Sequence, residues 1–278
     1  MPDPQPDLYL DLLKHSVTAS LYPESGWRVV TGFRPGRMTR SARVRRWAIR
    51  RLRRQGLMLI RPTAFDASAR AVGHDWPCFG YSMVGTARLN HLHACIDAVL
   101  RDNVPGDLLE AGVWRGGCTI FMQGMLVRKG VTNRRIWVAD SFEGLPPPRS
   151  DVDRALTSYD LSWSEYLAVG VDEVRANFAR FGLLHDNVCF LKGWFSNTLR
   201  AAPIQQLALL RLDADLYEST MDVLTALYSK VSRGGFVIVD DYHSWPGCRQ
   251  AVDEYRRAFD VTAPLLPIDE QAVWWRVS

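Results

Sequence analysis

The chain has 278 residues and a formal net charge of +4, with 47% hydrophobic and 23% charged residues. These values are ordinary for a globular protein and allow one large domain, or a domain with an extension. No run approaches the about 18 apolar residues that a membrane-spanning helix needs, and the first residues lack the pattern of a signal peptide. The five cysteines show no CxxC spacing, so we expect a reduced cytoplasmic chain rather than a disulfide scaffold or a zinc protein.

Arginines crowd the segment from Phe33 to Gly56. Such a basic run can bind nucleic acid or an anionic lipid surface. Its apolar residues are also spaced as on one face of an amphipathic helix that packs on the protein or on a partner subunit: Val44, Trp47, Ala48, Ile49 and Leu52. We favour the helix, because no other part of the chain shows the basic and aromatic pattern of a nucleic-acid-binding sheet.

Short apolar runs alternate with helix-like segments from about Tyr81 onward. The runs are apolar on both faces, as in the central strands of a parallel sheet covered by helices: residues 107–113, 134–141, 187–193, 207–215 and 234–241. Helical segments are expected between them, at residues 117–130, 162–182 and 217–235. This alternation predicts a doubly wound α/β fold.

The C-terminal part of the chain changes character. Residues 248–259 are expected to form a helix, and the runs 263–269 and 272–277 suit an antiparallel pair of strands at the sheet edge.

We divide the chain into an N-terminal extension with the arginine-rich segment, residues 1–60, and a main domain, residues 61–278. Within the main domain, residues 61–105 would form a lid and leading helix, and residues 106–278 the sheet core.

Acidic residues follow the ends of several predicted strands. Each could simply cap a strand or form a turn. Ligands of open parallel sheets, however, bind outside the carboxyl ends of the strands. We therefore expect these acids to surround one cleft: Glu110, Asp140, Asp213, Asp215, Asp240 and Asp241.

The first strand runs into the pattern Glu110-x-Gly112-x-x-x-Gly116-Gly117, which opens a helix. The glycines allow a ligand to approach the backbone closely, and a helix N-terminus favours negative charge. The spacing differs from the dinucleotide-binding GxGxxG, and Glu110 suits a cationic amino-acid group rather than a pyrophosphate. Asp140, at the end of the next strand, can accept both hydroxyls of a ribose. Together these features indicate S-adenosylmethionine rather than NAD.

Five segments resemble the macrocin O-methyltransferase family: "DLLEAGVWRGGCTIFMQGML", "VADSFEGLPPP", "FLKGWFSNTL", "LRLDADLYESTMDVL" and "GGFVIVDDYHSWPGCRQAVDEY". These enzymes depend on a metal ion and S-adenosylmethionine, and they methylate sugar hydroxyls of macrolide and aminocoumarin antibiotics. The resemblance runs from about Tyr81 to the C-terminus. It implies a class I methyltransferase fold with a mostly parallel seven-stranded sheet and helices on both faces.

The resemblance also implies which residues contact the methyl donor: Glu110, Gly112, Gly117, Asp140 and Ser141, with Gly193 and Trp194 near the adenine. Met83 lies just before the first long helix of the domain. The family places a lid over donor and acceptor there, so we count Met83 among the donor contacts.

Methyl transfer to an alcohol requires a general base or a divalent cation that acidifies the hydroxyl. The resemblance assigns a metal to Asp213, Asp240 and Asp241, and a set of three carboxylates suits magnesium rather than zinc. Without a cation, such a cluster of uncompensated carboxylates would repel itself. Asp215 lies two residues after Asp213, so in an extended segment both would project from one face. Asp215 is our candidate base, and His243 is the alternative base or a group that orients the substrate.

The sequence thus predicts a magnesium-dependent O-methyltransferase acting on a deoxysugar hydroxyl of a macrolide or similar antibiotic. One alternative is a catechol-type O-methyltransferase acting on an aromatic metabolite. Another, of a different class, is a nucleic-acid-associated protein that uses its arginine-rich segment. The expected acceptor is a glycosylated natural product, and we expect a homo-oligomer, a dimer or larger. We expect neither a nucleic-acid nor a membrane partner.

Overall fold

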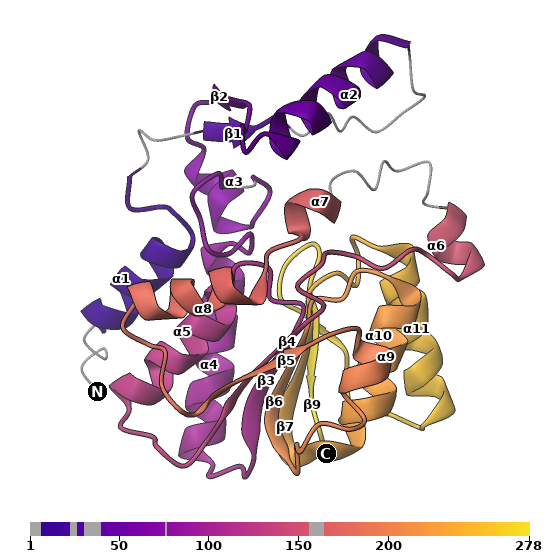
Figure 1. The fold of residues 1–278 in the computed structure, drawn as a ribbon. Helices are drawn as coiled ribbons and strands as arrows, with labels where there is room; N and C mark the ends of the chain where they lie inside the picture. The colour runs from indigo at the N-terminus through magenta and orange to yellow at the C-terminus, as the bar shows by residue number, and fades with distance from the viewer. Residues whose placement is uncertain (1–6, 23–26, 31–39, 76, 156–163) are drawn as a thin grey trace.

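A computed structural model describes residues 7–22, 27–30, 40–75, 77–155 and 164–278. Its centre is a seven-stranded sheet in the order β5-β4-β3-β6-β7-β9-β8 (Figure 1). The strands are β3 (Asp107–Ala111), β4 (Ile136–Asp140), β5 (Val188–Lys192), β6 (Leu207–Leu212), β7 (Val231–Val239), β8 (Leu266–Pro267) and β9 (Val273–Arg276).

Strands β3 to β7 pair in parallel, whereas β9 pairs antiparallel with both β7 and β8. The doubly wound sheet and its C-terminal edge hairpin are therefore confirmed. From β3 the chain runs outward through β4 to β5, and it then returns to place β6 on the other side of β3. The topological switch point, where open sheets bind ligands, lies between β3 and β6.

Helices cover both faces of this sheet (Figure 1). One face carries α1 (Leu8–Val17), α4 (Thr86–Arg101), α5 (Gly117–Arg128) and α8 (Val171–Arg180). The other carries α9 (Phe195–Thr198), α10 (Tyr217–Leu227) and α11 (Pro246–Ala258). Successive residues such as Leu108 and Leu109 belong to the cores on opposite faces, which explains why the strands are apolar throughout.

The N-terminal helix α1 is part of the domain core. Leu10, Leu13 and Val17 are buried in it, and the carbonyl oxygen of Val17 accepts hydrogen bonds from the backbone N–H groups of Tyr81 and Ser82. The domain boundary at residue 60 stays a prediction, but residues 8–17 pack as an integral element of the fold.

The arginine-rich segment forms the helix α2 (Arg40–Arg54), next to the hairpin of β1 (Trp27–Val29) and β2 (Ile60–Pro62). Residues 33–39 of that segment lie outside the described residues. Of the predicted apolar stripe, Ile49 is buried at 4% exposure, but Val44 and Trp47 are 66% and 65% exposed. The apolar stripe therefore packs on this chain only in part. None of the described helices combines the length and hydropathy that crossing a bilayer requires.

Two predicted helices differ from the structure. The expected helix at residues 162–182 begins at two residues that lie outside the described ones, and its described part consists of α7 (Ser164–Leu167) and α8. Gly170 between them has an extended backbone. Glycine is unfavourable inside a helix, and Asp172 and Glu173 after Gly170 suit the N-terminus of a new helix. The expected helix at residues 217–235 ends as α10 at Leu227, and after a short 3-10 turn β7 already begins at Val231. The remaining short helices are α3 (Ala67–Ala71) and α6 (Asp151–Ala155).

Gly112 allows β3 and β6 to meet closely at the switch point. Its φ is +88°, and a Cβ atom added there would lie 1.8 Å from the carbonyl oxygen of Asp213. The neighbouring backbone is tied across the sheet, because the N–H of Asp213 donates to the carbonyl of Ala111 at 2.8 Å. A side chain at position 112 would therefore force the ends of the two strands apart.

We predict that Gly112→Ala lowers the free energy of unfolding by about 3 kcal/mol or more, because the steric overlap adds to the backbone strain. Gly130→Ala is the matched control: its φ is +66°, but no atom lies within 4 Å of an added Cβ. It should show only the conformational cost of about 1–2 kcal/mol. Urea unfolding followed by circular dichroism measures both values, and equal losses would contradict the close approach.

Candidate active site

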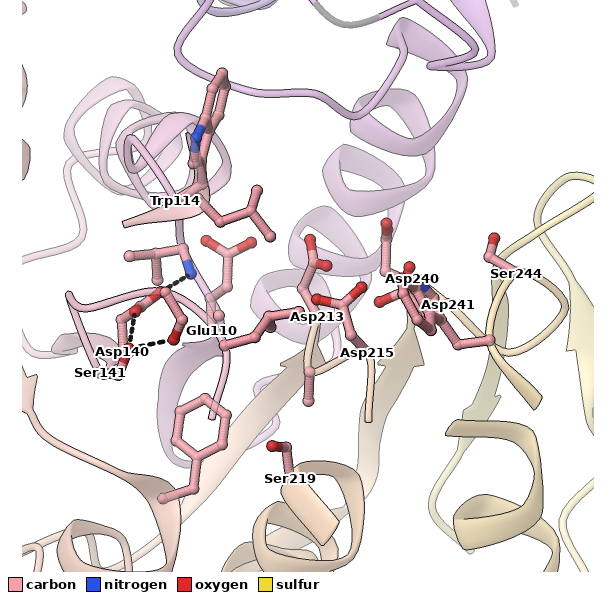
Figure 2. Close-up of a pocket in the computed structure, with 18 of the residues that line it drawn as sticks. Glu110, Trp114, Asp140, Ser141, Asp213, Asp215, Ser219, Asp240, Asp241 and Ser244 are labelled. Carbon is pink, nitrogen blue, oxygen red and sulfur yellow. Dashed lines mark hydrogen bonds between the residues drawn. The ribbon is translucent and has the colours of Figure 1, made fainter. Parts of the chain in front are cut away.

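A cavity of about 780 Å³ opens at the carboxyl ends of the parallel strands. Its size is typical of small-molecule sites. All the strand-end acids singled out in the sequence line it (Figure 2): Glu110, Asp140, Asp213, Asp215, Asp240 and Asp241. The structure thus brings together acids from the ends of β3 and β4 and from the loops that follow β6 and β7.

Glu110 lies at one end of the cavity and is buried within β3. Its Oε1 accepts a hydrogen bond from Arg211 at 2.6 Å, whereas its Oε2 is buried without a partner among the described residues. Burial raises the pKa of Glu110 to about 8, and the charge of Arg211 opposes that rise. A cationic ligand group can satisfy the remaining oxygen and favour the ionised carboxylate.

Asp140 holds the loops after β3 and β4 together. Its carboxylate accepts a hydrogen bond from the N–H of Val113 at 2.8 Å (Figure 2) and another from the N–H of Phe142 at 2.7 Å. Ser141 secures the same loop, since its hydroxyl donates to the carbonyl of Gly144 at 2.7 Å. Burial raises the pKa of Asp140, and these backbone donors oppose the rise. The Asp140 side chain is therefore fixed where it faces the cavity.

The other predicted donor residues divide into two groups. Gly112, Met83 and Trp194 line the cavity, whereas Gly117 and Gly193 do not. Gly117 packs against the 81–82 backbone, and a Cβ there would lie 2.5 Å from the Cβ of Ser82. Gly193 donates its N–H to the carbonyl of Asp140 at 2.9 Å. Both glycines shape the wall behind the cavity, and their contact with a donor stays a prediction.

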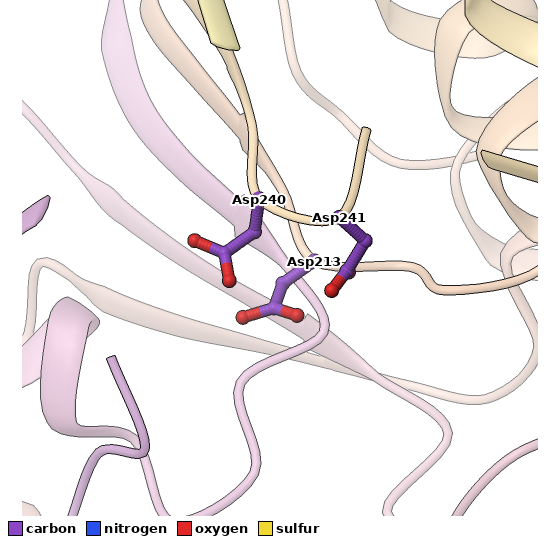
Figure 3. A group of neighbouring side chains, drawn as sticks. All are labelled: Asp213, Asp240 and Asp241. Carbon is purple, nitrogen blue, oxygen red and sulfur yellow. The ribbon is translucent and has the colours of Figure 1, made fainter. Parts of the chain in front are cut away.

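Asp213, Asp240 and Asp241 form a compact cluster (Figure 3). One carboxylate oxygen from each lies within 4.8 Å of the others. The Oδ2 atom of Asp241 is buried and has no hydrogen-bond partner in the described part of the chain. Burial raises the pKa of Asp213 and of Asp241, and the neighbouring carboxylates raise both further. These hard oxygen donors fit a divalent cation such as magnesium.

Two buried arginines accompany the carboxylates, and the sequence reasoning missed their role. Arg211, in β6, bonds Glu110, Asp213 and Asp240. Arg88, in α4, donates to Asp240 at 2.5 Å and to Asp269 at 2.7 Å. The premise that the acids lack any compensating charge without a cation is therefore wrong. The sequence did contain one signal of these pairs. Arg211 is a charged residue inside an otherwise apolar strand, and a buried charge requires an anionic partner.

The candidate bases lie in loops. Asp215 has a φ of +55° and lies at the centre of a tight turn, in which the N–H of Leu216 donates to the carbonyl of Ala214. The expected extended conformation after Asp213 is therefore wrong. Burial and the carboxylate of Asp213 raise the pKa of Asp215 well above its ordinary value, and both acids line the cavity. His243 is exposed at the rim, where its ring packs edge-on against Tyr242 and its backbone N–H donates to the carbonyl of Gln271.

The rest of the wall near the acids comes from the N-terminal ends of α10 and α11. It combines polar and aromatic groups: Glu218, Ser219, Asp222, Ser244, Trp245 and Pro246. Asp153 of α6 supports this wall, because its carboxylate accepts the N–H of Tyr217 at the start of α10 at 2.9 Å. The mixed lining suits a ligand with both hydroxyl groups and apolar faces.

The chain is similar to several known proteins. A sequence model of the macrocin-O-methyltransferase family matches residues 6–277. Mycinamicin III 3''-O-methyltransferase of Micromonospora griseorubida is 41% identical over 275 residues, which cover 98% of this chain and 97% of that protein. A tetracenomycin-C rhamnosyl 4'-O-methyltransferase of Streptomyces olivaceus is 50% identical over 214 residues, covering 76% of this chain and 81% of that protein.

The structure also resembles a solved O-methyltransferase, NovP. The TM-score is 0.81 at 40% sequence identity, and the match covers 98% of both chains. The similarity therefore spans the whole fold, including the N-terminal helices.

We predict that Arg88→Met lowers the free energy of unfolding by about 3–5 kcal/mol, because it leaves the buried Asp240 and Asp269 carboxylates with fewer partners. Arg101→Met is the control on the same helix. Arg101 is 71% exposed and pairs with Asp102 at the surface, so water screens the lost attraction and the change should be small. Urea unfolding in EDTA tests both, and similar losses would show that the Arg88 pairs contribute no more than a surface pair.

Proposed function

The chain belongs to the macrocin O-methyltransferase family, and we propose that it transfers the methyl group of S-adenosylmethionine to a deoxysugar hydroxyl of a glycosylated natural product, with magnesium as the metal. Family membership makes the protein an O-methyltransferase that uses S-adenosylmethionine. The observation that carries the finer proposal is one cavity that joins the Glu110 and Asp140 carboxylates to the cluster of Asp213, Asp240 and Asp241.

The donor would bind at the β3 and β4 end of the cavity. The free Oε2 atom of Glu110 is available to the ammonium group of the methionine portion. Asp140, held by the N–H groups of Val113 and Phe142, can accept the ribose hydroxyls with its remaining lone pairs. Trp194 provides an aromatic wall for the adenine. All three residues line the same cavity, which supports the assignment.

Asp213, Asp240 and Asp241 would hold the magnesium ion. They offer only carboxylate oxygens, and the unpartnered Oδ2 of Asp241 lacks the counter-charge that a cation provides. When bound, magnesium would supply Lewis acidity that makes an acceptor hydroxyl easier to deprotonate.

Asp215 is the proposed general base, because its carboxylate lines the same cavity as Asp213 and can accept a proton there. It would take the proton from the acceptor hydroxyl as the methyl group is transferred. Positioning of the two reactants in the cavity would supply most of the remaining acceleration. His243, at the exposed rim, is the alternative base or a group that orients the sugar.

The acceptor would lie between the acidic cluster and the wall from α10 and α11. Ser244, His243 and Gln271 offer polar groups there, and Trp245 offers an aromatic one. These groups suit the hydroxyls and apolar faces of a sugar better than the flat ring of a catechol, the alternative acceptor. The relatives named above are a mycinamicin and a rhamnosyl-tetracenomycin O-methyltransferase. A homo-oligomer and a cytoplasmic location stay predictions from the sequence.

We predict that removing divalent cations with EDTA lowers methyl transfer by about 100-fold, since metal catalysis contributes several kcal/mol. Adding magnesium should restore it. The assay follows S-adenosylhomocysteine release with a panel of glycosylated macrolides, beginning with mycinamicin III. Asp241→Asn should show the same loss while its affinity for S-adenosylmethionine, measured by calorimetry, stays within about twofold. Full activity after rigorous metal removal would contradict the magnesium proposal.

Asp215→Asn should lower kcat by about 100-fold or more, the usual contribution of a general base. Its affinities for S-adenosylmethionine and for Mn²⁺ should be retained, because the neutral amide removes only the proton acceptor. His243→Gln, the comparison variant at the rim, should change kcat by less than about tenfold. Unchanged turnover in Asp215→Asn with a large loss in His243→Gln would transfer the role of base to His243.

A further inference from the structure

Arg211 lies behind the cavity and links carboxylates that line it. Its side chain is 2% exposed and lies near the carboxyl end of the otherwise apolar strand β6. Nη1 donates to Oε1 of Glu110 at 2.6 Å and to Oδ2 of Asp213 at 2.9 Å, and Nη2 donates to Oδ1 of Asp240. One guanidinium therefore contacts a donor-side carboxylate and two carboxylates of the acidic cluster.

The sheet register explains this arrangement. Glu110 of β3 and Ile238 of β7 lie directly beside Arg211 on either side. Asp213 follows two residues further along the same strand direction, and Asp240 does so beyond Ile238. A planar guanidinium, with several N–H donors in fixed directions, can reach carboxylates from three neighbouring strands at once.

These bonds occupy one oxygen of Glu110 and leave the other available to a ligand. Because Oε1 accepts from Arg211, Oε2 is left buried and without a partner. The same guanidinium donates a hydrogen bond to one oxygen of Asp213 and to one oxygen of Asp240, which limits how these two carboxylates can rotate. The orientation of the Glu110, Asp213 and Asp240 carboxylates thus depends on the single side chain of Arg211, which lies behind them.

We propose that Arg211 is a positioning residue that aligns Glu110 for the methyl donor and Asp213 and Asp240 for the cation, so that its loss weakens binding at both ends. The proposal has two halves. The cation half, which concerns Asp213 and Asp240, rests on the proposed function, whereas the donor half, which concerns Glu110, requires only the family's methyl donor. Arg88 differs, because among the acids that line the cavity it hydrogen-bonds Asp240 alone.

The test measures the two affinities separately. Calorimetry with S-adenosylmethionine in EDTA gives the donor affinity, and electron paramagnetic resonance with Mn²⁺ in the absence of donor gives the cation affinity. Arg211→Met should weaken each by about tenfold or more, as loss of a ligand-orienting group commonly does. Arg211→Lys keeps the charge but not the planar fork, so it should recover part of each affinity.

Three control variants separate positioning from general damage. Glu110→Gln should weaken donor binding only, and Asp241→Asn should weaken cation binding only, since Asp241 shows no hydrogen bond to Arg211. Arg134→Met removes another arginine, which donates to the Val104 and Gly106 carbonyls ahead of β3. It should change neither affinity, because those carbonyls lie at the opposite ends of the strands.

A double variant tests whether Arg211 acts through Glu110. If it does, Arg211→Met combined with Glu110→Gln should bind S-adenosylmethionine no more weakly than Glu110→Gln alone. Additive losses would overturn the donor half, and so would wild-type donor affinity in folded Arg211→Met.

The remaining outcomes are also decisive. If Arg211→Met does not give a native near-ultraviolet dichroism spectrum, Arg211→Lys and its double variant carry the same test. Wild-type Mn²⁺ affinity in a folded Arg211 variant would overturn the cation half. Absence of Mn²⁺ binding to the unmodified protein would overturn the magnesium proposal and the cation half together, while the donor measurements still decide the role toward Glu110.

Discussion

The close approach of β3 and β6 at the switch point is the constraint on which the rest of the site depends. Gly112 has no side chain, and the carbonyl of Asp213 lies where a Cβ would be. This contact brings the donor-side loop after β3 next to the acidic loop after β6. A donor bound against one loop and an acceptor bound against the other would therefore lie in a single cavity, as methyl transfer requires.

Charge compensation is the second constraint. Burial raises the pKa of Asp213, Asp215 and Asp241, and the neighbouring carboxylates raise each of them further. Arg211 and Arg88 offset part of that repulsion, so the cluster can be built into the folded chain. Glu110 and Asp241, each with a buried oxygen that has no partner among the described residues, lie on either side of Asp213 in Figure 2. These two positions are where ligands of positive charge contribute most.

Much of the fold could be predicted because its signals are local. Strands such as β4 and β6 are short apolar runs between glycine-rich or polar turns, and their alternation with helices implies a parallel sheet. Helix boundaries were less predictable: the break at Gly170 and the early start of β7 at Val231 leave the apolar periodicity almost unchanged. The conformation of Asp215 was also mispredicted, since a left-handed backbone at an aspartate has no reliable local signal.

The sequence by itself determined which acids follow which strands, and hence that Glu110, Asp140, Asp213 and Asp240 share one edge of the sheet. That follows because parallel strands end on the same side. Only the tertiary structure decided which charges pair. Arg211 and Glu110 are 101 residues apart in the chain, and Arg88 and Asp240 are 152 apart. Such pairs depend on strand order and on how α4 packs against the sheet, and no local pattern encodes those contacts.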